Sequence, residues 1–223
     1  MDRPSYQMLI LIATPKLCDV AAEMFRKSDL PVQYRLGAEG TASSDIMDTL
    51  GLGSIDKGVL VSTVPRSFGN TMLAMLHSEL RLDAVNSGIA FTLPLSGVNQ
   101  LLLRMMEHTA QQHDNGKENT IMSDNTYALI TAIVNRGFSS EVMDAAREAG
   151  AGGGTVIHSR SISNEEATNF WGLSAQEERE LVLILAARED KIKIMSAISE
   201  RCGMHSDAKG LVMSLPIDSV MGL

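Results

Sequence analysis

A run of glycines in the second half of the chain is the first feature that could do chemistry. The stretch AGAGGGTVIHSR, from Ala149 to Arg160, carries four glycines in five positions before it turns apolar. Successive amides in such a run can cradle a phosphate. In phosphate-binding loops, however, the glycines follow a strand and open a helix, whose N-terminus faces the phosphate. Here they follow a predicted helix and precede a predicted strand. We therefore interpret Gly150–Gly154 as a tight turn with positive φ angles.

The loop GMHSDAKG, from Gly203 to Gly210, is a second candidate. It nearly matches the G-x-x-x-x-G-K-[ST] phosphate loop, but Ala208 replaces the second glycine and Gly210 replaces the Ser or Thr. It also lies between a predicted helix and a predicted strand, so we do not interpret it as a Walker loop. Two interpretations stay open: the amides and Lys209 bind a phosphate, or Lys209 is a solvated residue beside a strand.

The third candidate is the long connection Ser159–Arg179, which contains the only tryptophan, Trp171, beside Phe170. Connections of this length inside compact domains are usually functional or disordered. Two interpretations are again open. Phe170 and Trp171 contact a partner protein, or the connection is a flexible loop whose tryptophan is anchored on a neighbouring surface.

The other reactive side chains show no catalytic or metal-binding pattern. The two cysteines, Cys18 and Cys202, lack metal-type spacing and favour a reduced, cytoplasmic protein. No Ser–His–Asp arrangement can be assigned. We expect no enzyme activity and no metal site. The histidines, which also lack metal spacing, are His77, His108, His113, His158 and His205.

Composition excludes two classes of partner. The chain has 223 residues and a net charge of −8, with a pI near 5.1. An acidic surface repels phosphate backbones, so we expect no nucleic acid. The early apolar run MLILIA is too short for a signal peptide or a membrane span.

A weak internal repeat organises the chain. SGIAFTLPLSGVNQL (Ser87–Leu101) aligns with KGLVMSLPIDSVMGL (Lys209–Leu223) at a constant offset, and upstream segments align in the same order. We interpret this as a duplication. The predicted domains are residues 1–105 and 126–223, joined by a polar linker at 106–125.

The second copy has the clearer elements. Ser139 or Ser140 is expected to cap its first helix, and Gly150 to end it in the left-handed conformation. Apolar periodicity predicts strands at 128–134, 155–160, 180–185 and 210–215, with one helix from the serine cap through Glu148 and a second at 190–203. The order is βαββαβ, and the first copy repeats it. The predicted fold class is therefore α+β, with two tandem ferredoxin-like βαββαβ plaits.

Three segments of the second copy resemble the nitrogen-regulatory P-II signalling proteins. They are RGFSSEVMDAAREAGAGGGTVIHSR (Arg136–Arg160), ELVLILAARED and GLVMSLPIDSVMGL, which match in order and span nearly all of the second domain. The first domain matches only in layout and is similar to a degenerate copy. The resemblance implies a trimeric regulator that binds adenine nucleotides between subunits and controls transporters or enzymes through a loop between its second and third strands.

The resemblance also implies roles for particular residues. Thr155 stands where a threonine of the family helps to hold the adenine. The family's phosphate loop, Gly-Asp-Gly-Lys, is replaced here by Ser206-Asp207-Ala208-Lys209. The implied nucleotide-binding residues are Thr155, Gly203, Ser206, Asp207, Ala208 and Lys209, with Phe170 and Trp171 in the partner loop. That loop contains no tyrosine, so the uridylylation of some relatives cannot occur in it.

Together these patterns predict a P-II-like regulator in nitrogen-related metabolism. It would sense an adenine nucleotide, ADP, ATP or AMP, or another small effector, and would act on a transporter or an enzyme. We expect a homo-oligomer, because sheet edges and methionine-rich surfaces need covering. The alternative is a CutA-like metal-handling or structural assembly protein of the same fold, binding a divalent cation through His158 or His205.

Overall fold

The computed structural model describes residues 6–30, 33–41, 56–84, 87–95, 102, 104–106, 109, 126–160 and 178–222. Within these residues the protein is a mixed α+β structure, as predicted. Its strand pairs are antiparallel wherever their register is defined. Among the described residues, no helix has the length and apolar character that a membrane crossing needs.

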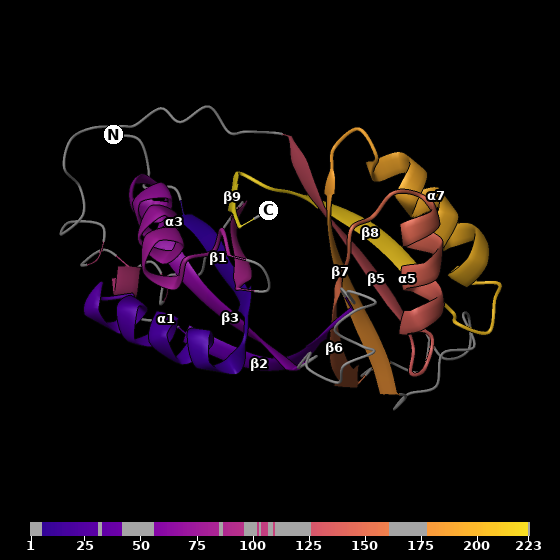
Figure 1. The fold of residues 1–223 in the computed structure, drawn as a ribbon, viewed down its shortest axis with the longest axis horizontal. Coiled ribbons are helices and arrows are strands. Elements are labelled where there is room, and N and C mark those ends of the chain that lie inside the picture. Colours follow the sequence, from indigo (N-terminus) through magenta and orange to yellow (C-terminus); the bar gives the residue numbers. More distant parts are fainter. Residues whose placement is uncertain are drawn as a thin grey trace. The chain divides into compact units, whose positions relative to one another are not determined.

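The chain forms two compact units, and each draws residues from both halves of the sequence (Figure 1). Unit 1 comprises Met1–Leu36, Lys57–Asn125 and Pro216–Leu223. Unit 2 comprises Gly37–Asp56 and Thr126–Leu215. The two units thus differ from a simple division of the sequence into halves. Gly37–Asp56, from the first half, belongs to unit 2, and Pro216–Leu223, from the second half, belongs to unit 1. The sequence-derived ranges 1–105, 106–125 and 126–223 stay a prediction.

Unit 2 contains the elements predicted for the second copy, in the predicted order. Its sheet has the strand order β8-β5-β7-β6, with the end of β2 beside β6. The elements are β5 (Tyr127–Asn135), α5 (Ser139–Glu148), β6 (Thr155–Arg160), β7 (Glu178–Ala187), α7 (Lys191–Cys202) and β8 (Leu211–Pro216).

Unit 1 repeats this arrangement. Its strand order is β2-β3-β1-β4-β9, so its four N-terminal strands have the same relative order as the four strands of unit 2. The elements are β1 (Tyr6–Ala13), α1 (Pro15–Lys27), β2 (Gln33–Gly40), β3 (Asp56–Pro65), α3 (Arg66–Leu80), β4 (Gly88–Pro94) and β9 (Ser219–Met221).

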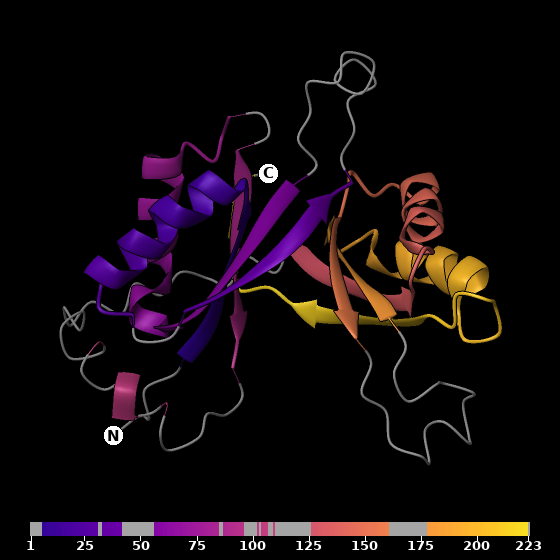
Figure 2. The same ribbon diagram turned by 90° about the horizontal axis from the view of Figure 1, so that it is seen from below.

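In each unit the helices pack side by side on one face of the sheet, which Figure 2 shows in a second view. Alternate strand residues face the helices and form an aliphatic core, as the low aromatic content of 4% requires. In unit 2 this core includes Val134, Ile184 and Ile198, all fully buried. In unit 1 it includes Leu11 and Leu76. Each such side chain contributes about 1.5–3 kcal/mol of burial free energy.

The strand β9 was not predicted from the sequence. It pairs with β4 through Phe91 and Val220, and the Asp218 amide donates to the Thr92 carbonyl at 2.9 Å. The buried Asp218 carboxylate accepts a hydrogen bond from Gln7 Nε2 at 2.7 Å. The C-terminal segment is thereby held on unit 1.

The expected serine cap of α5 is wrong. Phe138 occupies the N-cap position, and no side chain caps the helix there. Ser139 is the first helical residue, and its amide donates to Glu180 Oε2 at 2.9 Å. A carboxylate from the neighbouring strand thus takes over the role predicted for a local hydroxyl.

The glycine-rich turn is confirmed at its first residue and differs at the others. Gly150 has φ +105° and ends α5, with the Ala151 amide donating to the Ala146 carbonyl at 2.9 Å. Gly152 and Gly154 do not have the positive φ angles expected for them. Gly154 is required for space instead, because a Cβ there would lie 2.7 Å from Met143 Sδ and 3.1 Å from the Leu183 carbonyl oxygen.

Two alanine substitutions in this turn separate these roles. Gly154→Ala should lower the free energy of unfolding by about 1–3 kcal/mol, because the added methyl overpacks the space against β7. Gly152→Ala is the matched control: nothing lies within 4 Å of its Cβ, so its stability should be unchanged or slightly raised. Chemical denaturation of the full chain measures both, and equal effects would contradict the assignment.

Candidate functional site

Thr155 is held between two strands at the start of β6. Its Cα partners are Leu183 in β7 and Gly40 in β2. The residue is buried, with 8% of its surface exposed. The neighbour from β2 was not foreseen, because the sequence gives no local signal for pairing between strands from different halves of the chain.

Thr41, which follows β2, binds both backbone groups of Gly154. Its amide donates to the Gly154 carbonyl at 2.9 Å, and the Gly154 amide donates to Thr41 Oγ1 at 2.8 Å. The Thr41 hydroxyl also donates to the Gly154 carbonyl at 2.9 Å, and Arg147 donates to the Thr41 carbonyl. The last glycine of the run therefore binds a threonine of the same chain, and its amide is not free for a phosphate.

The loop Gly203–Gly210 is closed by its own hydrogen bonds. The Ser206 amide donates to the Gly203 carbonyl at 3.0 Å, and the Lys209 amide donates to the Ser206 carbonyl at 3.1 Å. The Gly210 amide donates to the Cys202 carbonyl at 2.9 Å, and the Ser206 hydroxyl to the Gly203 carbonyl at 2.7 Å. The amides of Ser206, Lys209 and Gly210 are therefore already bonded to carbonyl groups of the chain and are not available to a phosphate.

The same loop is anchored on β5. The amide of Asn135 donates to the Ala208 carbonyl and its side-chain amide to the Asp207 carbonyl, both at 2.8 Å. Ala208 is 1% exposed and belongs to the core of unit 2. Lys209 has φ +47°, in the left-handed region. These hydrogen bonds hold the backbone of the loop, and Lys209 is its only lysine or arginine.

Within unit 2 the structure does not bring Thr155 and Lys209 together. Thr155 lies on β6 and Lys209 precedes β8, and the strands β5 and β7 separate the two. Three strand spacings amount to about 14 Å across the sheet. The residues implied by the resemblance therefore form two separate half-sites in unit 2.

The predicted partner loop lies outside the described residues. Phe170 and Trp171 both belong to its undescribed part, 161–177, so their role stays a prediction. The same holds for His108 and His113 in the predicted linker.

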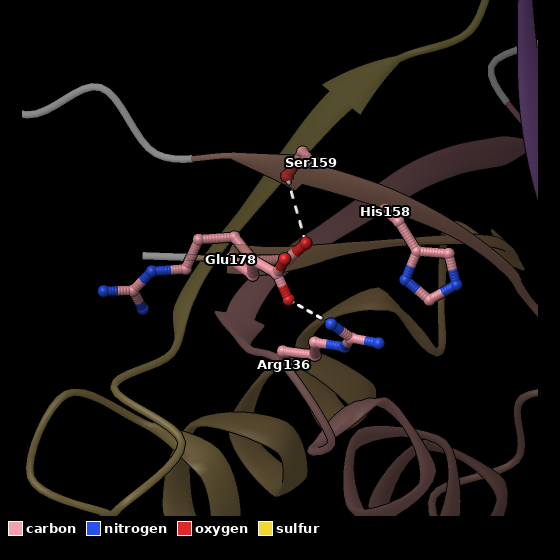
Figure 3. A pocket seen from close by; sticks show the side chains of 5 residues that line it. Arg136, His158, Ser159 and Glu178 are labelled. Carbon is pink, nitrogen blue, oxygen red and sulfur yellow. Dashed lines mark hydrogen bonds and ion pairs between the residues drawn. The ribbon is translucent and has the colours of Figure 1, made fainter. Parts of the chain in front are cut away.

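A pocket of about 320 Å³ lies where that connection leaves β6 and enters β7 (Figure 3). In Figure 3, Arg136 points toward Glu178, with which it forms an exposed ion pair, and His158 lies beside them. The Ser159 hydroxyl donates to the Arg179 carbonyl at 3.3 Å. The lining residues are Arg136, His158, Ser159, Glu178 and Arg179.

His158 in this pocket faces two carboxylates from different strands. Its Nε2 lies 3.3 Å from Glu39 Oε1, and its Nδ1 lies 3.8 Å from Glu180 Oε1. These contacts are ion pairs only while the imidazole is protonated. Arginine and imidazole donors at the base of a long connection suit a small molecule that carries a carboxylate or phosphate group.

Sequence reasoning missed most of this pocket. It named His158 only as a weak metal candidate and did not connect it with Arg136 or Glu178. A signal was present, because the polar residues HSR and EERE stand at the two ends of the same connection. The ends of two antiparallel neighbours meet, so charged residues placed there gather at one point.

Glu180 has its pKa lowered. Burial of the carboxyl raises the pKa, but hydrogen bonds from Ser139 and the Gly137 amide, together with the nearby His158, lower it by more. The charged carboxylate thus faces the N-terminus of α5, where the helix dipole stabilises an anion.

Both cysteines are free and buried, and burial raises the pKa of each thiol. The thiol is then the stable form at neutral pH, which disfavours nucleophilic or metal-binding chemistry. No group of three or more His, Cys, Asp or Glu side chains among the described residues has an arrangement suited to a metal ion.

The role of Glu180 can be tested through the pH dependence of stability. A carboxyl whose pKa is lower in the folded state stabilises the fold above its ordinary pKa, and this contribution is lost as the pH falls through the lowered value. Glu180→Gln should therefore lower the free energy of unfolding by about 1 kcal/mol at pH 7. The difference from the unmodified chain should shrink below about pH 4.3.

Glu178→Gln is the matched control, because Glu178 is half exposed and its ion pair with Arg136 lies at the surface. Exposed pairs contribute little, so the substitution should change stability by less than about 1 kcal/mol. Urea titrations across this pH range give both values. A pH-independent difference for Glu180→Gln would contradict the assignment.

Comparison with known proteins adds only distant structural likenesses. No protein-family model matches the chain, and no curated protein sequence matches it. Solved structures that resemble it include an unknown protein from Galdieria sulphuraria, with 8% identity and a TM-score of 0.30, covering 96% of this chain and 99% of that one. A microcompartment protein from Desulfitobacterium hafniense has 12% identity and a TM-score of 0.29, covering 96% of each chain. A crystal structure described as a glycine cleavage system transcriptional repressor has 8% identity and a TM-score of 0.28, covering 96% of this chain and 99% of that one. At these scores the overlaps carry no argument about function.

Proposed function

We propose that this chain is a P-II-like regulatory protein built from two tandem ferredoxin-like plaits. In this proposal it senses an adenine nucleotide or another small effector and regulates a transporter or an enzyme in nitrogen-related metabolism, without turning over a substrate. The observation that carries the proposal is the repeated strand order of the two units. Four strands in the order fourth-first-third-second, joined as βαββαβ, define the ferredoxin-like plait.

The positions of the residues implied by the P-II resemblance support the proposal. Thr155 starts the second strand of unit 2, and Ser206–Lys209 immediately precede its fourth strand. These are the positions at which the family holds an adenine and a phosphate. Because β5 and β7 separate the two half-sites, one nucleotide would reach both only where plaits meet in an assembly. The proposal therefore includes a homo-oligomer.

The pocket at the base of the β6–β7 connection supports the regulatory part of the proposal. His158 and Ser159 end β6, and Glu178 and Arg179 begin β7. An effector in this pocket would contact both ends of the connection at once. Binding of the effector would then favour one conformation of the connection, which in this proposal contacts the partner protein.

Nucleotide titration of the full chain tests the proposal. ADP, ATP and AMP are titrated by calorimetry while the fluorescence of the single tryptophan is followed. At least one nucleotide should bind below the millimolar range. Lys209→Ala should weaken that binding by roughly tenfold or more, because a charge-assisted contact to phosphate is lost.

Lys193→Ala is the control, since Lys193 is an exposed lysine on α7 away from the loop. It removes the same charge and should leave the affinity unchanged. Failure of every nucleotide to bind below the millimolar range would refute the nucleotide-sensing proposal. Equal losses in the two variants would place the site elsewhere.

A further inference from the structure

The strand β8 is the last described strand at one side of the sheet of unit 2, and it has an exposed apolar face. It stands at the end of the strand order of unit 2, with β5 as its neighbour among the described strands. Val212 packs against the core of unit 2 on the helical side. Leu211, Met213 and Leu215 alternate with it and are 43%, 42% and 42% exposed. The strand therefore presents a row of three large apolar side chains beside a backbone edge that no other described strand covers.

This edge lacks the charged residues that keep most open edges from pairing. Proteins protect exposed edge strands with lysine or other charges, bulges or proline. No charged residue occurs from Gly210 to Ile217, although 21% of the chain is charged. Pro216 comes only at the end of the strand. An edge of this composition is suited to be covered by another strand.

The sequence of β8 is complementary to itself. In an antiparallel pair, directly opposed residues share a face of the sheet. A two-fold axis at Met213 opposes Met213 to its own copy and Leu211 to Leu215. All three exposed apolar residues then meet apolar partners. A register shifted by one residue opposes Met213 to Ser214 and moves the apolar row to the wrong face.

We propose that β8 pairs antiparallel with β8 of a second copy of this chain, around a two-fold axis at Met213. The pairing continues the sheet of unit 2 into that of its partner and brings the two apolar rows together. A self-complementary patch of this kind closes as a dimer contact. The inference does not depend on nucleotide binding.

Disulfide trapping tests the register directly. With Met213→Cys, the two new thiols should lie on directly opposed residues, with Cα atoms about 4.5–5.5 Å apart, which is within disulfide range. Cys18 and Cys202 are both buried, so their background should be low. Mild oxidation should convert most of the chain to a covalent dimer linked through position 213.

Ile192→Cys is the matched control, because Ile192 is a 66% exposed apolar residue on α7 of the same unit. It should form covalent dimers much more slowly. Equal rates for the two variants, or no dimer from Met213→Cys, would overturn the proposal.

The mass of the assembly gives an independent reading. Met213→Lys places like charges opposite each other across the axis, and should halve the molar mass found by analytical ultracentrifugation. Ile192→Lys should leave the mass unchanged, with circular dichroism confirming that both variants fold. A monomeric unmodified chain, or an assembly that Met213→Lys does not change, would refute the pairing.

Discussion

The second unit depends on the close approach between Thr41 and Gly154. Both backbone groups of Gly154 bond to Thr41, and a side chain at Gly154 would collide with β7. A glycine is needed here for space rather than for a left-handed backbone. The approach fixes the end of β2 beside β6, so that Gly40 pairs with Thr155 and Glu39 reaches His158. The last glycine of the run is thus explained by a contact within the chain, and a phosphate bound by the Gly154 amide would have to displace Thr41.

That constraint also shapes the candidate site. Because β2 lies along β6, the backbone edge of β6 at Thr155 is occupied, and a ligand would approach from a face of the sheet. Three amides of the Lys209 loop are also bonded, to the carbonyls of Cys202, Gly203 and Ser206, and Asn135 ties the loop to β5. Donor side chains for an anion stand at two places, with Lys209 in this loop and with Arg136, His158 and Arg179 at the pocket beside β6 and β7.

The sequence predicted the local elements well, because apolar periodicity and glycine positions are local signals. The helix expected to end at Glu148 ends there in the structure, and the strand expected at 155–160 has those bounds. Long-range pairing could not be predicted in this way. Nothing near Thr41 indicates a partner at Gly154, and nothing near Ser219–Met221 indicates pairing with β4. The predicted serine cap of α5 was wrong for the same reason, because the group that replaces it, the Glu180 carboxylate, lies on β7, far along the sequence.

The two strand pairings that were not predicted from the sequence, β2 with β6 and β9 with β4, have a common role, which is to cover sheet edges. In unit 2 the end of β2 covers β6, and in unit 1 the strand β9 covers β4. Each cover comes from the opposite half of the chain, so neither half contains all of its own unit. Each unit therefore needs a strand segment from the opposite half of the chain to cover the edge of its sheet. Unlike the edges of β6 and β4, the edge of β8 in unit 2 has no such cover among the described strands. It is also the edge with three exposed apolar side chains.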